Sequence, residues 1–508
     1  MIEPEFSPFA PLYDAGSAQL VSTRLVADLE TPVSAFLKLS RGRNGNLFLL
    51  ESVEGGAARG RYSMIGLDPD LLWRAIGARA EINRNPAADA DAYTGTGQKP
   101  LGSLRAIIAE STVAAHPLTQ ALPPMAAGIF GYLGYDMVRQ MEDLATARPD
   151  PIGVPDAVML RPTLMVVFDS VKDEVWVVTP VRPSAGVTAQ AAYARAIDRL
   201  EAIVTVLEGP LHHDIAAADP HLLANAGVSN TPEAEFLGMV AKAKEHIVAG
   251  DVFQVVLSQR FTAPFALPAF SLYRALRRVN PSPFLCYLDF GGFQIVCSSP
   301  EILVRVWNGK ITIRPIAGTR WRGKTPAEDD ALAAEMLADE KERAEHLMLL
   351  DLGRNDVGRV AAIGTVTVTD KFLVERYSHV MHIVSNVEGR LNEDHDNIDA
   401  LAAGFPAGTV SGAPKVRAMQ IIDTLERDKR GIYGGCIGYF GASGEMDTCI
   451  VLRTSIVKDG LMHVQAGAGI VFDSVPENEH RECVNKAMAL FRAAEEAVRF
   501  ATRAKRGQ

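Results

Sequence analysis

The sequence predicts an α+β fold in which large antiparallel β-sheets are covered by helices on the outside. Pairs of strand-like segments are joined by two-residue turn signals at Gly291-Gly292, Asn308-Gly309 and Asp459-Gly460. Helical patterns collect in separate blocks at about 326–352, 412–427 and 477–502. Frequent hairpins favour antiparallel sheets, and separate helix blocks are typical of α+β proteins.

The chain divides at a polar, Ala-rich stretch, 209–231, which we interpret as a linker. It separates an N-terminal region, 1–225, from a C-terminal region, 232–502. The C-terminal region opens with a helical pattern that Gly250 ends, and a strand is predicted over 251–261. Polar residues follow one face of this strand: Gln254, Ser258 and Arg260.

Composition and charge exclude several classes of protein. Of the 508 residues, 48% are hydrophobic and 22% charged, as in ordinary globular proteins. The 51 Lys+Arg and 61 Asp+Glu give a net charge of −10, which disfavours a nucleic-acid partner. No uncharged apolar run approaches the ~20 residues that cross a bilayer, so we expect a cytoplasmic protein without a membrane partner. The five cysteines form no C-x-x-C pair, and we expect them to be reduced and mostly buried.

Two predicted helices carry pairs of carboxylates three residues apart. One pair is Glu342 and Glu345, and the other is Glu479 and Glu482. Side chains at this spacing share a helix face, about 5–6 Å apart, so each pair can serve one hard cation directly or through water. Lys486 follows on the same face as Glu482. Such pairs are more often solvated helix surface, so the spacing alone leaves a metal site as one of two interpretations.

Three other motifs are ambiguous on their own. The Gly/Ser/Thr-rich segment 408–420 feeds a helix and could bind an anion through its N–H groups, but a capped turn is the simpler explanation. His382 lies on a predicted strand, where a single histidine usually serves structure. Gly434 to Gly438, with Cys436 at the centre, superficially matches a nucleophile elbow. We reject that match because the flanking residues predict strand and loop, whereas an elbow turns from a strand into a helix.

Longer motifs run along nearly the whole chain. They are LLES (49–52), RYSMIG (61–66), NPSPF (280–284), SSPE (298–301), RPIAGTRWRG (314–323), ERAEHLMLLDLGRND (342–356), VMHIVSNVEG (380–389), PAGTVSGAPK (406–415), IYGGCIGY (432–439), QAGAGIV (465–471) and NEHRECVNKA (478–487). Together and in this order they resemble the motifs of the chorismate-utilising enzymes, and specifically of the anthranilate synthase component I family.

The resemblance implies a sandwich of antiparallel sheets with helices packed outside, and a Mg²⁺ site. Glu345 and Glu482 would bind the ion directly, while Glu342 and Glu479 would hold metal-bound water. The ion would then clamp the ring carboxylate of chorismate. The resemblance also assigns substrate binding to Gly318, Thr319, Tyr433, Arg453, Gly467, Gly469 and Lys486.

The same resemblance implies catalytic roles. Glu301 would protonate the departing 4-hydroxyl, His382 would assist pyruvate elimination, and Thr409 would lie in the same pocket. Gln254 stands where isochorismate and salicylate synthases have a lysine that activates water, and glutamine cannot take that proton. Ala317 stands where typical aminodeoxychorismate synthases have a lysine that attacks the ring.

The expected reaction is therefore addition of ammonia at C2 of chorismate with loss of the 4-hydroxyl, followed by elimination of pyruvate to give anthranilate. That reaction makes the chain a lyase at the first committed step toward tryptophan. Two alternatives are an aminodeoxychorismate synthase component I and a catalytically dead relative kept as a tryptophan-binding regulatory subunit. The presence of Glu301, His382 and all metal glutamates disfavours the dead relative.

The resemblance further implies feedback inhibition by tryptophan and a partner subunit. Glu51 and Ser52 would bind the ammonium group of tryptophan, and the indole would lie against Asn280, Pro281, Ser282, Pro283 and Phe284. The following Leu285-Cys286 departs from the residues that relatives often carry. Nothing in the chain resembles an amidotransferase, so a separate glutamine amidotransferase subunit, component II, would supply the ammonia.

Overall fold

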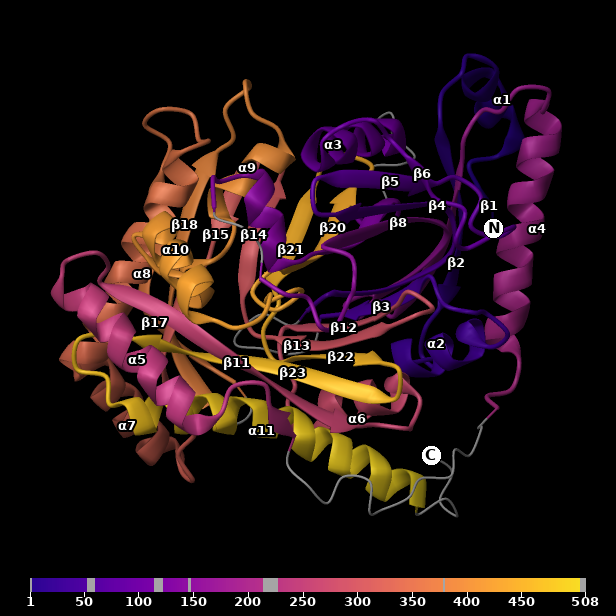
Figure 1. The fold of residues 1–508 in the computed structure, drawn as a ribbon. Coiled ribbons are helices and arrows are strands. Elements are labelled where there is room, and N and C mark those ends of the chain that lie inside the picture. The colour runs from indigo at the N-terminus through magenta and orange to yellow at the C-terminus, as the bar shows by residue number, and fades with distance from the viewer. Residues whose placement is uncertain are drawn as a thin grey trace.

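The strands of the protein form one hydrogen-bonded antiparallel network that divides into two layers (Figure 1). The computed structural model describes residues 2–52, 60–113, 122–144, 148–212, 227–377 and 380–502. The centre of the predicted linker lies outside these ranges. The network divides at β8 (Ala157–Asp169), which pairs along its length with β4 (Tyr62–Ile76). On its other side, the first half of β8 pairs with β7 and the second half with β9.

The first layer runs outward from β8 in two directions. Its strands, in spatial order, are β1 (Ile2–Glu3), β2 (Gln19–Val26), β9 (Glu174–Val181), β8, β4, β3 (Leu47–Glu51), β12 (Phe284–Asp289), β13 (Gln294–Ser299), β22 (Thr454–Lys458), β23 (Leu461–Ile470) and β11 (Gln254–Pro264). The short strands β10 (Val228–Ser229) and β19 (Gly412–Ala413) both pair with β11. Strand β3 of the N-terminal region pairs with β12 of the C-terminal region, so this layer combines strands from both sequence regions.

The second layer starts at the other side of β8. It contains β7 (Gly128–Leu133), β20 (Cys436–Gly441), β21 (Met446–Ile450), β14 (Ile302–Trp307), β15 (Lys310–Ile313), β16 (Ile316–Trp321), β18 (Val380–Arg390) and β17 (Thr367–Arg376). Two further strands, β5 (Arg79–Asn83) and β6 (Thr94–Gly95), extend from β4.

Helices cover the outer faces of both layers (Figure 1). They are α1 (Phe6–Asp14), α2 (Pro32–Ser40), α3 (Pro100–Ser111), α4 (Ala189–Glu208), α5 (Glu233–Val248), α6 (Ala269–Val279), α7 (Pro326–Ala338), α8 (Glu340–Gly358), α9 (Asn397–Gly404), α10 (Lys415–Leu425) and α11 (Pro476–Thr502), with the 3₁₀ turns η1 (Tyr135–Gln140) and η3 (Gly408–Val410). None of the helices in the described ranges has the length and apolarity needed to cross a membrane. The predicted α+β sandwich with outer helices is confirmed.

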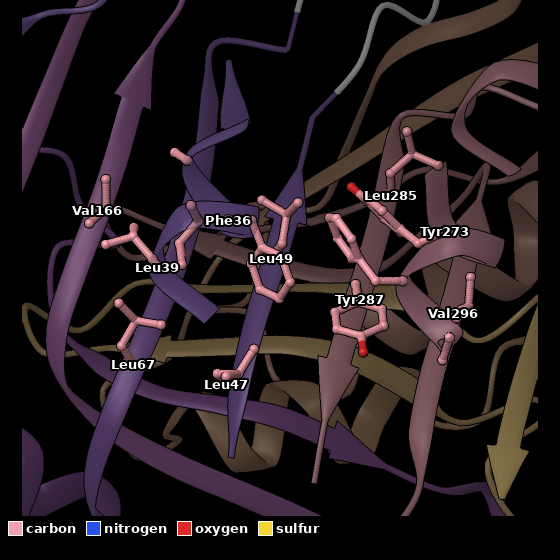
Figure 2. Close-up of a cluster of buried hydrophobic side chains, with 14 of the residues drawn as sticks. Phe36, Leu39, Leu47, Leu49, Leu67, Val166, Tyr273, Leu285, Tyr287 and Val296 are labelled. Atoms are coloured by element: carbon pink, nitrogen blue, oxygen red, sulfur yellow. The ribbon is translucent and has the colours of Figure 1, made fainter. Parts of the chain in front are cut away.

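Alternation along the strands separates the core into an inner and an outer part. On β12, Leu285 and Tyr287 pack with α2 and α6 on the outside of the first layer (Figure 2). Cys286 and Leu288 point the other way, into the interior between the layers. This period of two buries both faces of the central strands, as expected for a sandwich whose layers are also covered by helices.

The predicted hairpins are confirmed, while two longer segments needed correction. The turns at Asn308-Gly309 and Asp459-Gly460 have positive φ at both residues, as a two-residue hairpin turn requires. The helix predicted over 326–352 is interrupted at Asp339, whose side chain accepts hydrogen bonds from the first N–H groups of α8. The strand-like segment that precedes the Asp459-Gly460 turn signal, 448–457, is not one strand but two, β21 and β22, because Arg453 lies between them with φ of +49°. The break sends the chain from the second layer to the first.

Candidate active site

Several predicted catalytic residues converge at the junctions between strands. Glu301 lies between β13 and β14, His382 is on β18, Thr409 is in η3, and Arg453 separates β21 from β22. The charge of Arg453 acts on both Glu301 and His382, and Thr409 donates a hydrogen bond to Glu301. The structure therefore brings together residues that are more than 150 positions apart in the sequence.

Glu301 is a buried acid without a strong partner. Its side chain is enclosed, and burial raises its pKa to about 8, although Thr409, the Ile316 N–H and Arg453 oppose the shift. Thr409 Oγ1 is 3.4 Å from Glu301 Oε1. A small pocket lies against both residues and is otherwise lined mainly by apolar side chains of β14, β15 and α8. At neutral pH the carboxyl can therefore carry a proton and donate it.

His382 has a defined tautomer. Its Nδ1 lies 2.9 Å from the Gly318 carbonyl, which can only accept a hydrogen bond, so Nδ1 carries the proton. The Thr319 hydroxyl lies 3.1 Å from the same nitrogen. Burial lowers the pKa of His382, and Arg453 lowers it further, while the Gly318 hydrogen bond raises it. The imidazole is thus held neutral with a lone pair on Nε2, as a general base requires.

Gly318 and Thr319 lie at a β-bulge in β16, where the pairing with β18 shifts between Ala317 and Thr319. Gly318 has φ of +70°, and a Cβ at this position would lie 3.3 Å from Glu342 Oε2. Ala317 is buried and pairs with Ile383. The bulge therefore places the Gly318 carbonyl against His382 and leaves room for the α8 carboxylate.

Arg453 presents a cation that forms no ion pair with the residues that the structure describes. Burial lowers the pKa of its guanidinium, and Glu301 and Tyr377 act in the opposite direction. In the described part of the chain, no carboxylate lies within 4.0 Å of it. A partly exposed guanidinium with open donors is suited to a carboxylate ligand.

Strand β23 offers two backbone amides. The Ser258 N–H on β11 points away from β23 and donates to the Glu426 carboxylate. Ser258 and its partner Gly467 on β23 therefore form a non-hydrogen-bonded pair, and the N–H and C=O of Gly467 point outward, away from β11. Lys486 Nζ donates to that outward carbonyl at 3.0 Å. Gly469, two residues on, has the same orientation. β22 ends before it reaches either glycine, so no strand in the described ranges covers these two N–H groups.

The same glycines make room for two predicted side chains. A Cβ on Gly469 would lie 2.4 Å from Gln254 Nε2, and one on Gly467 would lie 2.8 Å from the Tyr433 hydroxyl. Gln254 is buried, and its Oε1 has no hydrogen-bond partner among the described residues. An unsatisfied buried acceptor is costly, so this atom is suited to a ligand that donates.

The two carboxylate pairs lie on helices, as predicted, and influence one another. Burial raises the pKa of Glu345, and the charges of Glu342 and Glu482 raise it further. Burial also raises the pKa of Glu479, with a further contribution from Glu482. Two of the four carboxylates have cationic partners: Arg320 lies 2.9 Å from Glu342, and Lys486 lies 2.7 Å from Glu482.

The donor set fits a hard divalent cation. All four side chains offer oxygen, the ligand type that Mg²⁺ prefers, and their mutual repulsion would be relieved by a cation. Among the described residues, no three of these carboxylates have oxygens within 4.8 Å of one another. Mg²⁺ usually keeps several waters, so a wider arrangement is compatible with direct ligands supplemented by water-mediated ones.

The predicted effector residues also come together. Glu51 at the end of β3 pairs with Leu285 on β12, immediately after the 280–284 segment. The Glu51 carboxylate accepts hydrogen bonds from Arg277 at 2.8 and 3.1 Å and from the Tyr273 hydroxyl. Asn280 Nδ2 is buried and has no partner among the described residues. Ser52, next to Glu51, is half-buried.

A buried network behind the site was not predicted. The Arg430 guanidinium donates to Glu426 at 2.6 and 2.8 Å and to backbone carbonyls of η3 and β11 at 2.6 and 2.7 Å. Glu426 also accepts from the N–H and hydroxyl of Ser258 at 2.7 and 2.9 Å. The network therefore ties the turn that carries Thr409 to the strand that begins with Gln254.

Tyr377 is a second residue that the sequence did not indicate. Its ring lies edge-on to the His382 imidazole, with centroids 5.5 Å apart, and its hydroxyl donates to Glu375 at 2.9 Å. It thus packs against His382 and also interacts electrostatically with Arg453. Cys436, by contrast, is buried in β20, and burial raises its pKa to about 12. The rejection of a nucleophile elbow is confirmed, as is the burial of the cysteines, all five of which are buried.

Comparisons with known proteins agree with this arrangement. Residues 68–492 match the family model described as chorismate binding enzyme. The chain is 55% identical to anthranilate synthase component 1 of Cereibacter sphaeroides over 99% of both chains, and 45% identical to that of Acetivibrio thermocellus over 94% and 95%. The crystal structure of anthranilate synthase component I from Streptococcus pneumoniae superposes with a TM-score of 0.73 at 36% identity, covering 92% of this chain and 99% of the other.

A more distant structure shares the fold. The menaquinone-specific isochorismate synthase of Escherichia coli has a TM-score of 0.70 at 19% identity, over 94% of this chain and 95% of its own. At that identity the similarity supports a shared fold, the sandwich with its outer helices, and no statement about activity. On the family match and the full-length relatives, this chain belongs to the chorismate binding enzymes, in the branch of the anthranilate synthase component 1 proteins.

Proposed function

We propose that this chain adds ammonia to C2 of chorismate, with loss of the 4-hydroxyl, and then eliminates pyruvate to form anthranilate. The observation that carries the proposal is the pairing of a buried acid with a neutral base. Glu301 is protonated up to a pH of about 8, and His382 keeps a free lone pair on Nε2. A leaving hydroxyl needs the first group, and an elimination that removes a ring proton needs the second.

Glu301 supplies the proton for the first step. As ammonia adds at C2, the two ring double bonds shift and the C4–O bond breaks, so the departing oxygen takes the Glu301 proton and leaves as water. The ammonium formed at C2 then loses a proton to solvent. The apolar pocket beside Glu301 keeps the acid protonated until the C4–O bond breaks. The Thr409 hydroxyl orients the carboxyl by donating to Oε1.

His382 serves the second step. Removal of the C2 proton from the aminated ring by Nε2 breaks the C3–O bond and forms the aromatic ring. The released enolpyruvate takes up a proton at its methylene carbon and becomes pyruvate. The Nδ1–H bond to the Gly318 carbonyl fixes the imidazole and stabilises the imidazolium that forms. The Tyr377 ring packs edge-on against the imidazole.

Cationic and N–H groups bind the two substrate carboxylates. We assign one carboxylate to Arg453, which has no ion pair with any described residue, and to the outward N–H groups of Gly467 and Gly469. Lys486 contacts both the Gly467 carbonyl and Glu482, so it borders this surface and the acidic cluster. Thr319 and Tyr433 complete the pocket walls.

The acidic cluster would hold Mg²⁺. We assign Glu345 and Glu482 as direct ligands and Glu342 and Glu479 as holders of metal-bound water. When bound, the ion supplies charge stabilisation to the ring carboxylate. Arg320 and Lys486, which contact Glu342 and Glu482, would then need to loosen or share these carboxylates.

Two residues support ammonia as the nucleophile. Gln254 Oε1 is a buried acceptor that can hold an N–H of ammonia, but an amide cannot deprotonate water. Ala317 has no group that could attack the ring, so a covalent lysine intermediate is impossible at this position. The same reasoning disfavours isochorismate and 4-amino-4-deoxychorismate as products.

Product identification tests the proposal. The purified chain is incubated with chorismate, Mg²⁺ and concentrated ammonium at mildly alkaline pH, and the products are separated and identified by mass. We expect anthranilate and pyruvate in equal amounts, with activity lost when Mg²⁺ is chelated. Isochorismate or 4-amino-4-deoxychorismate as the main product would contradict the assignment of Gln254 and Ala317.

The N-terminal region, 1–225, would contribute regulation by tryptophan. β3 places Glu51 and Ser52 beside the 280–284 segment, and the unsatisfied Asn280 Nδ2 offers a buried donor to an effector. Because Glu51 is already bound by Arg277 and Tyr273, an effector ammonium would have to share its carboxylate. Ser52→Arg should blunt tryptophan inhibition and spare the uninhibited rate, and an unaltered tryptophan response would remove Ser52 from the site.

The ammonia source would be a separate glutamine amidotransferase subunit in the cytoplasm. The relatives' designation as component 1 is consistent with a second component. Cys436 is buried with a raised pKa and cannot release ammonia from glutamine. The chain alone should therefore use ammonium but not glutamine, and the added partner should restore glutamine use. Robust glutamine-dependent turnover by the pure chain would refute this.

A further inference from the structure

Three cysteines far apart in sequence meet between the two layers. Cys286 on β12 pairs directly with Cys297 on β13, and Cys449 reaches them from β21 of the second layer. Their sulfur atoms all lie within 4.8 Å of one another. Among the described residues, this is the one group of three or more Cys, His, Asp or Glu side chains with ligand atoms that close together.

The alternation of the strands explains how the thiols converge. Leu285, Tyr287 and Val296 face the helices on the outside of the first layer (Figure 2). Their neighbours Cys286 and Cys297 consequently face the interior, where Cys449 points toward them. All three thiols are at most 4% exposed.

The spacing suits a shared thiophilic ion. With metal–sulfur bonds of about 2.3 Å, sulfurs on one ion lie about 3.8–4.0 Å apart. Three sulfurs already within 4.8 Å need to move by less than about 1 Å to reach that arrangement. Soft thiolates select closed-shell thiophilic ions over Mg²⁺ or Ca²⁺.

We propose that Cys286, Cys297 and Cys449 form a binding site for one thiophilic d¹⁰ ion, such as Cu⁺ or Cd²⁺, separate from the carboxylate cluster. Each metal–thiolate bond forms as an S–H bond breaks and its proton leaves to solvent. The site would tie β12, which follows the 280–284 segment, to the strands that lead to Glu301 and Arg453. Zn²⁺ would bind more weakly, because it prefers four ligands and the cluster supplies three.

Metal uptake by the whole chain tests this proposal. The reduced chain is incubated anaerobically for several hours with Cd²⁺, or with Cu⁺ in a parallel arm, so that the buried site can open and load. After desalting, bound metal is counted per chain, the cadmium–thiolate charge-transfer band is recorded, and the melting temperature is measured. We expect about one ion per chain and a raised melting temperature, since binding to the native state stabilises it.

Cysteines outside the cluster provide matched controls. Cys436 and Cys483 are 1% and 0% exposed, so their replacement by Ala creates a comparable cavity. Cys286→Ala and Cys449→Ala should lower metal content at least tenfold and abolish the melting shift, whereas Cys436→Ala and Cys483→Ala should leave both unchanged. Cys449→Ser, which keeps the volume, replaces any Ala variant that does not fold. Absence of uptake by the wild type, or equal uptake by the cluster variants, would overturn the proposal.

Discussion

Two glutamates of this protein are almost equally buried but have different electrostatic surroundings. Glu51 on β3 is 4% exposed and Glu301 is 7% exposed. Glu51 forms an ion pair with Arg277 and accepts from Tyr273. Glu301 has only the long hydrogen bond from Thr409 as a side-chain partner in the described residues. Burial with a partner fixes a carboxylate in place, whereas burial without one prepares a proton donor.

Glu301→Gln should give the largest effect on activity. The amide keeps the shape but cannot donate a proton to the leaving hydroxyl, so kcat should fall about 10²–10⁴-fold. Glu51→Gln is the matched control, and its uninhibited kcat should change less than about threefold, because Glu51 lies outside the catalytic pocket. The comparison would fail if the two variants lost similar activity in a steady-state anthranilate assay.

Glu426→Gln tests a third buried glutamate, which is paired like Glu51 but lies next to the site. Leaving the buried Arg430 uncompensated should lower the free energy of unfolding by about 3–5 kcal/mol. Denaturant unfolding measures this loss, and the activity should fall with it because η3 and β11 lose their shared anchor. As a control, Asp351→Asn breaks an exposed pair with Arg354 and should cost less than about 0.5 kcal/mol. Equal losses in both variants would show that the buried network does not anchor the site.

The two glutamates of the comparison should respond to Gln substitution with opposite signs in stability. Because the pKa of Glu301 is raised to about 8 in the folded state, folding requires proton uptake between about pH 4.5 and 8, which lowers stability as pH rises. Glu301→Gln removes that requirement and should stabilise the protein by about 1–3 kcal/mol at pH 8. Glu51→Gln leaves Arg277 and Tyr273 with a weaker partner and should destabilise it by about 1–3 kcal/mol. Denaturant unfolding at pH 8 compares them, and a shared sign would break the distinction.

The sequence predicted the features that depend on local residues. Hairpins at Asn308-Gly309 and Asp459-Gly460 follow from residues that tolerate positive φ. The break at Arg453 could not be predicted, since a continuous β-prone run carries no information about which layer each half joins. The split of the 326–352 helix at Asp339 was similarly hidden, because a single capping residue can also sit on a helix surface.

The sequence motifs predicted the residues of the candidate site, but they did not predict the contacts that support those residues. Glu301 and His382 came from the resemblance, and the structure adds the buried acid and the defined tautomer. Glu426 and Arg430, four residues apart, have the spacing of an ordinary solvated ion pair, and only tertiary packing buries them. Tyr377 offered no spacing or motif that could mark it.

The pH dependence of the rate gives the smallest and sharpest test of the distinction between Glu301 and Glu51. If Glu301 is the acid, its protonated fraction falls tenfold per pH unit above about 8. The rate per free NH₃ should therefore fall about tenfold for each unit, which corresponds to a rise of about 1.4 kcal/mol in the apparent barrier. Expressing rates per free NH₃ removes the opposite effect of pH on the nucleophile. Glu51→Gln should keep this alkaline limb unchanged, whereas the residual rate of Glu301→Gln should lose it. A wild-type rate per free NH₃ that stays flat between pH 8 and 9.5 would mean that another group donates the proton, and the burial of Glu301 would then need a structural explanation.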